Sequence, residues 1–254
     1  MLHITPTQRF SSRVGNYARC RPSYPQEIIE ILREECGLTS ELVVADVASG
    51  TGMFTRLLLE NGNAVYGVEP NEAMRKAGEE YLANYSKFTS IAGTAETTTL
   101  ADVSVDLVTA AQAAHWFDRE KALDEFRRIL KPGGYLVLIW NDRRTDATAF
   151  DHEYEQLLDE YGTDYAEVKR RDKVSTEFFG AIPHNTRTLP NFQEFDYAAL
   201  EGRLLSSSYT PQHGHPSHLP MISELRRIFE AHQNSGSIRM EYDTKLYFGR
   251  LSAK

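Results

Sequence analysis

The sequence has little of what stabilises secreted proteins or anchors membrane proteins. Its 254 residues include two cysteines, Cys20 and Cys36, which are too few for a disulfide framework and have no further ligands at metal-binding spacing. No apolar run approaches the roughly 20 residues of a membrane span, and the first residues, MLHITPTQRF, lack the apolar stretch of a secretion signal. These absences predict a cytoplasmic protein with no metal site and no membrane partner.

Positive charge is also scarce. The 28 Lys and Arg residues stand against 36 Asp and Glu residues, which gives a formal net charge of −8. A nucleic-acid-binding protein normally carries a basic face, whereas Arg127, Arg128 and Lys131 lie at a predicted helix end, where cations suit the helix dipole. We therefore expect no nucleic-acid partner, and the oligomeric state stays open.

Short apolar strands alternate with helices over the first 141 residues. Strands are expected at 42–47, 64–70, 87–92, 105–110 and 135–140, and helices at 25–36, 54–60, 71–85 and 118–130. This alternation is typical of a parallel sheet with right-handed crossovers. The pattern predicts an α/β fold with a Rossmann-like, doubly wound sheet.

The alternation stops after Asn141. Residues 145–180 are polar, rich in tyrosine and helical in pattern, and Pro183 and Pro190 indicate a connection after them. A short helix near Asp196, a helix over 217–232 and a last strand over 238–251 follow. We predict a single domain in three segments: an N-terminal segment and cofactor-binding core (1–141), a helical cap insertion (142–190), and a C-terminal sheet with acceptor-side elements (191–254).

A small-residue turn follows the first strand. The strand carries Asp46 near its end and leads into Ala48-Ser49-Gly50-Thr51-Gly52 and then a helix, the arrangement with which open α/β sheets hold adenosine-containing ligands. The dinucleotide motif G-x-G-x-x-G would need a glycine where Thr55 stands. Asp46 would also repel a phosphate and attract a cation. The turn favours S-adenosylmethionine over a nicotinamide dinucleotide, and an acid after apolar strand residues implies a partner for Asp46.

Further polar residues follow the next two strands. A carboxylate at Glu69 can accept hydrogen bonds from both ribose hydroxyls, although it could also be an exposed acid beside a helix capped by Asn71. Thr94, Ala95 and Glu96 follow the third strand, where the adenine should lie. Glu96 could equally cap the adjoining turn.

The fourth strand leads into Gln112-Ala113-Ala114-His115-Trp116, which should lie at the same rim of the sheet. Alanines there would let a ligand approach the backbone. His115 could be a base or a packed core residue, and Trp116 could be core or offer its face to a cation.

Two other groups are candidates for ligand contacts. Near the N-terminus, Tyr17 could face the sulfonium of the cofactor and Arg21 its carboxylate, unless the segment is an ordinary basic and aromatic loop. In the C-terminal third, five cationic or titratable side chains would suit an acidic small molecule if they converge: Arg187, Arg203, His213, His215 and His218.

Six short motifs occur in one order along the chain. They are Y-x-x-x-R-P-x-Y-P from Tyr17, a D-x-G-x-G-T-G-like run over 46–52, V-x-G-V-E-P ending at Pro70, G-x-A-E from Gly93, Q-A-x-H-W-F-D from Gln112 and L-K-P-G-G from Leu130. Together they resemble the class I S-adenosylmethionine-dependent methyltransferases, nearest the type 11 methyltransferase domain and the trans-aconitate methyltransferases. One departure is Ala48, which adds a methyl group where that family has the first glycine of the turn.

The resemblance implies a seven-stranded sheet, mostly parallel with an antiparallel last strand, and S-adenosylmethionine as the cofactor. The residues expected at the cofactor are Tyr17, Arg21, Asp46, Ala48, Ser49, Gly50, Gly52, Glu69, Pro70, Met74, Thr94, Ala95, Glu96, Gln112, Ala113, His115 and Trp116.

The expected reaction is methyl transfer by in-line displacement to an oxygen, nitrogen or carboxylate of a small molecule. A carboxylate acceptor needs no base, whereas a hydroxyl or amine would give its proton to His115, Tyr17 or Tyr209. Two alternatives stay open: a non-catalytic S-adenosylmethionine-binding or regulatory domain whose cap closes the acceptor space, and a nicotinamide-dependent oxidoreductase.

Overall fold

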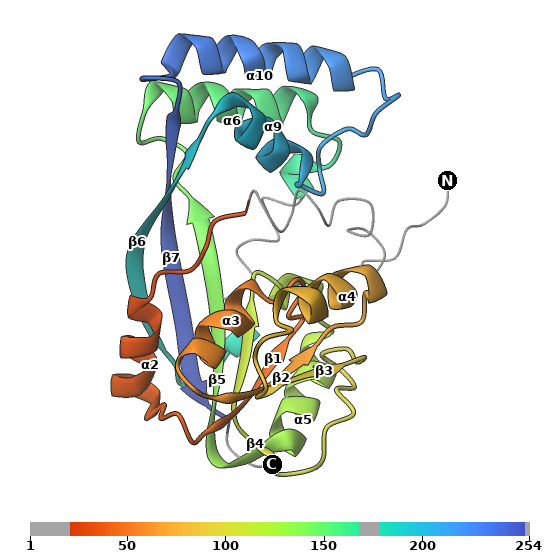
Figure 1. Ribbon diagram of the computed structural model, residues 1–254, viewed down its shortest axis with the longest axis vertical. Coiled ribbons are helices and arrows are strands. Elements are labelled where there is room, and N and C mark those ends of the chain that lie inside the picture. Colours follow the sequence, from red (N-terminus) through yellow and green to blue (C-terminus); the bar gives the residue numbers. More distant parts are fainter. Residues whose placement is uncertain (1–20, 168–177, 252–254) are drawn as a thin grey trace.

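A seven-stranded sheet forms the centre of the molecule (Figure 1). The computed structural model describes residues 21–167 and 178–251. The strands are β1 (Val43–Val47), β2 (Ala64–Val68), β3 (Phe88–Ile91), β4 (Val105–Ala111), β5 (Leu130–Arg143), β6 (Asn185–Phe195) and β7 (Ile238–Arg250), in the order β3-β2-β1-β4-β5-β7-β6. Only β7 runs against the others among these strands, since it pairs antiparallel with both β5 and β6. The predicted Rossmann-like fold with an antiparallel last strand is confirmed.

Helices cover both faces of the sheet. They are α2 (Glu27–Cys36), α3 (Met53–Glu60), α4 (Glu72–Tyr81) and α5 (Arg119–Ile129). Successive strand residues point to opposite faces: Val44 and Val137 pack with the apolar faces of α2 and α3, whereas Ala45 and Leu138 pack with α5. The near-continuous apolar runs of the inner strands follow from burial on both sides.

One edge strand differs from the sequence prediction. Residues 185–195, which were expected to be a connection because of Pro183 and Pro190, form β6. Proline cannot donate to a ladder hydrogen bond, but an edge strand tolerates it. Most side chains of β6 are exposed or half-buried, so the strand lacks the apolar pattern that marks β1 or β4. The predicted boundary at residue 190 falls inside this strand.

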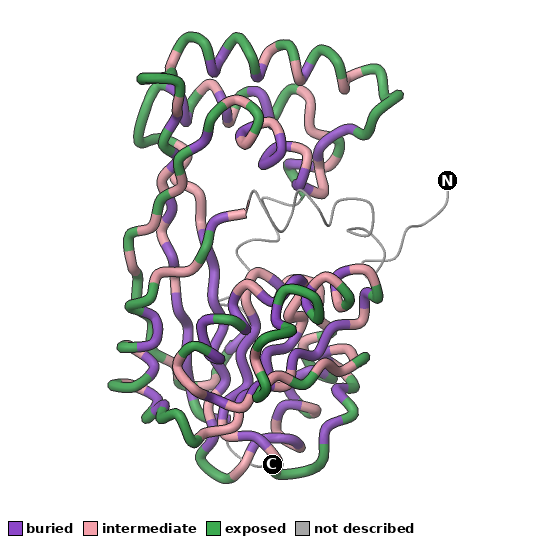
Figure 2. The backbone as a smooth tube through the Cα atoms, viewed as in Figure 1, coloured by how far each residue is buried: buried purple, intermediate pink, exposed green. Residues whose placement is uncertain are grey.

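A second group of helices lies beyond the end of the sheet (Figure 1). These are α6 (Ala149–Tyr161), α9 (Tyr197–Leu205) and α10 (His218–His232), here called the helical layer. Their buried side chains, with Phe195 and Tyr242 of the strands, form a core of their own, visible as the upper buried zone of Figure 2. The long strands β5, β6 and β7 extend past the rest of the sheet to carry this layer.

The helical layer is larger than the predicted cap. It takes α6 from the segment 142–190 but α9 and α10 from the segment after it. No helix within 21–167 and 178–251 combines the length and apolar character needed to cross a membrane.

Candidate functional site

The site starts at the turn between β1 and α3, where the backbone bends sharply. Ala48, Gly50 and Gly52 have φ angles of 56°, 58° and 82°, in the left-handed region that favours glycine. A Cβ on Gly52 would lie 2.6 Å from Leu82 Cδ1, so that position must stay glycine for packing as well. Gly52 lines none of the cavities described below, so its predicted contact with a cofactor stays a prediction.

Asp46 lies near the end of β1 and links this strand to α3 and β4 through hydrogen bonds. Its carboxylate is buried and accepts hydrogen bonds from Thr55 Oγ1 at 2.6 Å and Thr109 Oγ1 at 2.9 Å. Burial raises the pKa of Asp46 to about 6, and the two threonine bonds act in the opposite direction. α3 and β4 each supply a partner for this carboxylate, as the sequence implied, and the predicted contact of Asp46 with a cofactor stays a prediction. Thr55, which replaces the third glycine of the dinucleotide motif, supplies one of the two donors.

Glu69 joins the turns that follow β1 and β2. One carboxylate oxygen accepts the N–H of Gly50 at 3.0 Å and the other accepts the N–H of Asn71 at 2.8 Å. Asn71 in turn caps α4 by accepting from the N–H groups of Ala73 and Met74. Glu69 is 7% exposed, and burial raises its pKa. The exposed-acid interpretation is therefore wrong.

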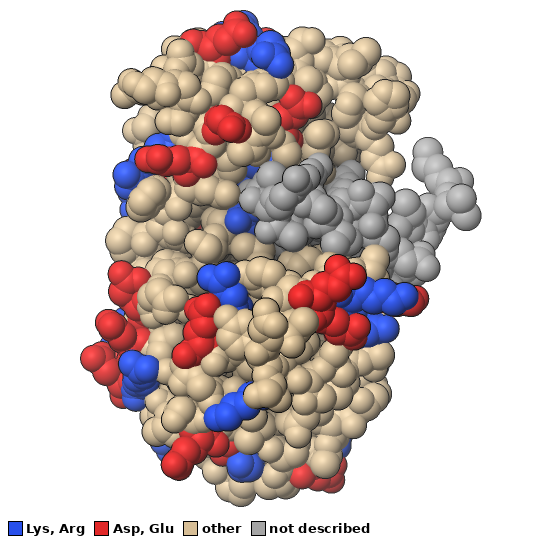
Figure 3. Space-filling view, viewed as in Figure 1, with Lys and Arg blue, Asp and Glu red and all other residues tan. Residues whose placement is uncertain are grey.

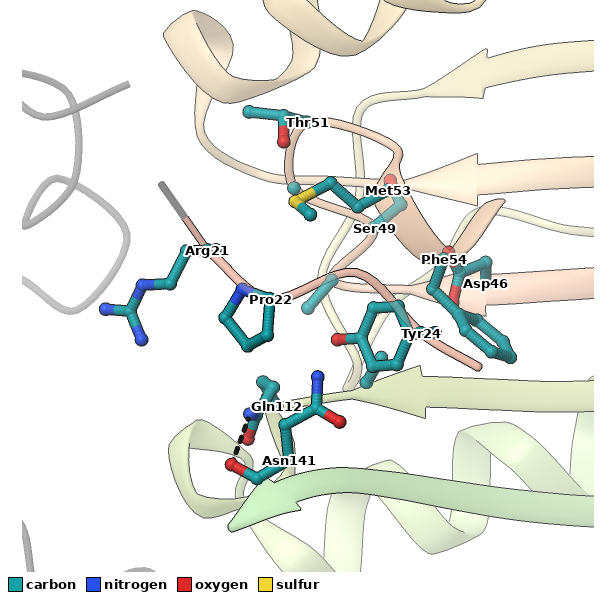
Figure 4. Close-up of a pocket in the computed structure, with 13 residues that line it drawn as sticks. Arg21, Pro22, Tyr24, Asp46, Ser49, Thr51, Met53, Phe54, Gln112 and Asn141 are labelled. Carbon is teal, nitrogen blue, oxygen red and sulfur yellow. Dashed lines mark hydrogen bonds between the residues drawn. The ribbon is translucent and has the colours of Figure 1, made fainter. Parts of the chain in front are cut away.

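Two cavities adjoin the turn. The first, the turn cavity, is about 40 Å³ and lies between the strip Arg21–Tyr24, the turn 48–54 and the ends of β4 and β5 (Figure 4). The second, the rim cavity, is about 160 Å³ and opens over the ends of β2, β3 and β4. Ala48, Gly50, Ala111 and Gln112 border both cavities, so the two form neighbouring parts of one groove along the rim.

A third cavity of about 450 Å³, the layer cavity, lies between the rim and the helical layer. Its basic side chains are Arg21, Arg143, Arg144, Arg203 and Lys245. Its aromatic side chains are His115, Trp116, Trp140, Tyr165, Tyr209 and Tyr242. The wall of this cavity therefore combines cations with rings that carry polar tips.

Gln112 borders all three cavities. It has a φ of 57°, and its side-chain amide donates to the carbonyl oxygen of Asn141 at 3.1 Å, a bond drawn in Figure 4. Trp116 borders both the rim cavity and the layer cavity, and Arg21 borders both the turn cavity and the layer cavity. The groove and the layer cavity are therefore neighbours that share lining side chains.

The structure brings together most of the residues expected at a cofactor. Those lining the turn or rim cavity are Arg21, Asp46, Ala48, Ser49, Gly50, Glu69, Pro70, Met74, Thr94, Ala95, Glu96, Gln112, Ala113 and Trp116. Tyr17 lies outside the described residues. Glu96 borders the rim cavity and also accepts the N–H of Asp118, so it serves the local turn as well.

His115 lies at the layer cavity, not in the groove along the rim. It belongs to a single turn of 3-10 helix, η2 (Ala114–Trp116), and its ring centroid is 4.4 Å from that of Trp116 and 5.2 Å from that of Trp140. Tyr209 borders the same cavity, with its ring centroid 4.8 Å from that of Tyr165. Both proposed bases therefore face the space next to the groove.

The five C-terminal side chains considered for an acidic ligand do not converge. Arg203 borders the layer cavity, but Arg187 forms an ion pair with Glu35 of α2. His213 and His218 contact each other in the loop before α10, where His218 Nδ1 lies 2.9 Å from the carbonyl oxygen of Pro211.

Sequence reasoning missed several residues of the site. Asn141 directly follows a predicted strand of the parallel sheet, so its place at the rim could have been inferred. No local signal marks Arg143, Tyr165 or Tyr242, because strand length and helix packing bring them together.

Within 21–167 and 178–251, no group of three or more His, Cys, Asp or Glu side chains could hold a metal ion. Acidic and basic side chains are interspersed on the face shown in Figure 3.

Comparison with known proteins agrees with this geometry. Residues 45–138 match the family described as a methyltransferase domain. An uncharacterized methyltransferase of Mycobacterium tuberculosis is 42% identical over 134 residues, 53% of this chain and 52% of that protein. An uncharacterized methyltransferase-like protein of Schizosaccharomyces pombe is 32% identical over 156 residues, 61% of this chain and 59% of that protein. The chain spans little more than half the length of these curated relatives.

A solved methyltransferase structure from Anaeromyxobacter dehalogenans has the same fold, with a TM-score of 0.67 and 22% identity over 92% of this chain and 99% of that chain. The glycine turn and the acid after β2 lie within the matched residues, whereas β6 and β7 lie outside them. Residues 45–138 of the chain are thus similar to a methyltransferase domain, and the chain has the fold of the solved methyltransferase structure.

Proposed function

We propose that this protein transfers a methyl group from S-adenosylmethionine, bound along the turn and rim cavities, to a small molecule in the layer cavity. The observation that carries the proposal is the contact between these spaces at Gln112, Trp116 and Arg21. A donor in the groove and an acceptor in the layer cavity would meet there. Alignment of two bound reactants is the main contribution that a protein makes to this chemistry.

The residues of the groove fit the parts of the cofactor. Glu69 lies between the two turns, where it can exchange its backbone donors for ribose hydroxyls. Thr94 to Glu96 border the far end of the rim cavity, on the side of the adenine, while Arg21 borders the turn cavity and can pair with the methionine carboxylate. Small side chains at Ala48, Gly50 and Ala111 leave room for the ligand between these ends.

When bound, S-adenosylmethionine would supply a methyl group on a sulfonium, with a neutral thioether as the leaving group, and the residues of the groove described above would hold it. Trp116 and Gln112 border both spaces, so they would contact the donor and the acceptor where the two meet. A carboxylate acceptor has no proton to lose. A hydroxyl or amine acceptor would pass its proton to His115 or Tyr209, which both face the layer cavity.

A non-catalytic binding domain would need the helical layer to close the acceptor space. The layer cavity of about 450 Å³ favours an enzyme instead. A nicotinamide-dependent oxidoreductase is disfavoured by the buried acid under the turn and by Thr55, which holds that acid in place of a third glycine.

Calorimetric titration of the full chain with S-adenosylhomocysteine and with NAD tests the first half of the proposal. Incubation with methyl-tritiated S-adenosylmethionine and a library of small acids, amines and alcohols tests the second. We expect binding of the nucleoside, no binding of NAD and transfer to at least one acceptor. Binding without any transfer would favour the non-catalytic domain, and binding of NAD alone would favour the oxidoreductase.

A further inference from the structure

Arg203 is a buried cation in the wall of the layer cavity. It lies on α9, is 7% exposed, and its Nη1 donates to Ser207 Oγ at 2.9 Å. Its Nε has no hydrogen-bond partner. The ionisable groups that interact with it are the hydroxyls of three tyrosines, Tyr154, Tyr209 and Tyr242. These three hydroxyls are neutral at ordinary pH, so none of them balances the charge of the guanidinium.

Three other cations of this wall, Arg143 of β5, Arg144 after it and Lys245 of β7, each have a carboxylate partner. Arg143 pairs with Glu155, and Lys245 pairs with Asp142 at 2.7 Å. Arg144 lies 2.7 Å from Asp243 and 3.1 Å from Glu241. Among the described residues, no carboxylate forms an ion pair with Arg203. Arg203 differs from its neighbours in this respect.

Such a charge is costly to keep. An arginine side chain stays protonated at any ordinary pH, so it cannot relieve the cost by losing its proton. Removing an ion from water costs several kcal/mol even after the surrounding protein relaxes, unless a counter-charge is near. A ligand anion would provide that counter-charge, and the fork of the guanidinium suits two oxygens of one group.

We propose that Arg203 is a specificity-determining residue that binds an oxyanion of the methyl acceptor, either a carboxylate or a phosphate. This inference rests on the function proposed above. Tyr209 borders the same cavity, and its hydroxyl can donate to a remaining oxygen lone pair of the anion.

The position of Arg203 adds a second element to the proposal. It lies on α9 of the helical layer, whereas Gln112 directly follows β4 of the sheet and borders the groove; Figure 1 shows α9 beyond the end of the sheet. The proposal places the anchored oxyanion and the atom that receives the methyl group at different ends of the acceptor. The acceptor is an anionic small molecule whose reacting oxygen or nitrogen lies at its other end.

Methyl transfer to matched pairs of compounds tests this proposal. The panel contains carboxylic acids with their amides and phosphate monoesters with their alcohols, each carrying a second hydroxyl, amine or carboxylate. We expect at least one anionic member to be methylated with kcat/KM on the order of 100-fold above its neutral counterpart, as for a buried charge pair. The active class, acid or phosphate monoester, identifies the source of the oxyanion. Equal rates for anionic and neutral members overturn the proposal.

Arg203→Met and Arg203→Lys separate binding from structure. Removing a contact made equally in the ground and transition states raises KM and leaves kcat unchanged. We expect Arg203→Met to raise KM for the anionic acceptor by a factor of roughly 30 or more, to leave the affinity for S-adenosylhomocysteine unchanged, and to be partly rescued by lysine. An unchanged KM overturns the proposal. Loss of nucleoside binding by the wild type would instead refute the underlying function.

The unfolding temperature without ligand distinguishes a binding role of Arg203 from a structural one. Loss of a residue that only binds the acceptor should not lower this temperature, whereas loss of a structural residue should. Because Arg203 has no carboxylate partner, Arg203→Met should unfold at the same temperature as the wild type or above it. The matched control is Arg227→Met on α10, where the arginine pairs with Glu153 and Glu224 outside the cavity. That control should leave acceptor preference unchanged. A much lower unfolding temperature for Arg203→Met would assign the residue to structure and overturn the proposal.

Discussion

Replacing Thr55 with valine tests the interpretation of the buried acid under the turn. The two side chains have nearly the same shape, but valine cannot donate to Asp46. The lost bond is 2.6 Å long and joins two side chains that are 0% and 1% exposed. A hydrogen bond to a charged group contributes about 1.5–3 kcal/mol. For a chain of this size that corresponds to a decrease in Tm of roughly 5–10 °C.

The effect should depend on pH in a defined direction. The pKa of Asp46 is raised from 3.8 to about 6 in the folded protein, so its neutral form is favoured by folding. The stability that this group contributes is fully present below pH 3.8 and is lost as the pH rises through about 6. The Thr55 bond limits that loss by stabilising the carboxylate. The cost of Thr55→Val should therefore be larger at pH 8 than at pH 5.

Urea unfolding at both pH values measures this cost. The matched control is Thr244→Val, since Thr244 is also buried but donates to the neutral amide oxygen of Asn141. Its cost should be about 1 kcal/mol and independent of pH. A Thr55→Val cost that is the same at pH 5 and pH 8, or no larger than that of the control, would refute the reasoning.

Three further changes have expected outcomes. Ala48→Gly should raise the free energy of unfolding by up to about 1 kcal/mol, because it relieves a left-handed alanine whose φ is 56° and loses part of that gain through chain entropy; urea unfolding measures it, and a decrease would contradict it. Glu69→Gln should weaken S-adenosylhomocysteine binding about tenfold or more by calorimetry, since a charged acceptor for the ribose becomes neutral; an unchanged affinity would remove Glu69 from the ribose. Asn71→Ala should lower the stability by about 1 kcal/mol through loss of the α4 cap, and an unchanged Tm would count against that cap.

Local sequence patterns predicted the part of the fold nearest the turn. The β1–turn–α3 unit and the caps at Asn71 and Asp118 depend on residues close together in the chain, so turn and cap chemistry identify them. The edge strand β6 has half-exposed side chains and a proline, and its pairing with β7 could not be inferred from its own residues.

The candidate site also has one part that the sequence predicts and another part that it does not. The groove residues follow strand ends in order, which is why most of them were predictable. The layer cavity is assembled from the extended ends of β5 and β7 together with α9, which only tertiary packing brings together. The sequence implied a partner for Asp46 but could not indicate that Thr55 and Thr109 face the same carboxylate.

A crystal structure with S-adenosylhomocysteine bound is the most direct test of the proposed donor site. The account predicts the ribose beside Glu69, the adenine over Thr94–Glu96, the homocysteine carboxylate toward Arg21, and the sulfur facing the layer cavity next to Gln112. Density for the nucleoside anywhere else, or a groove that stays empty at saturating concentration, would contradict it.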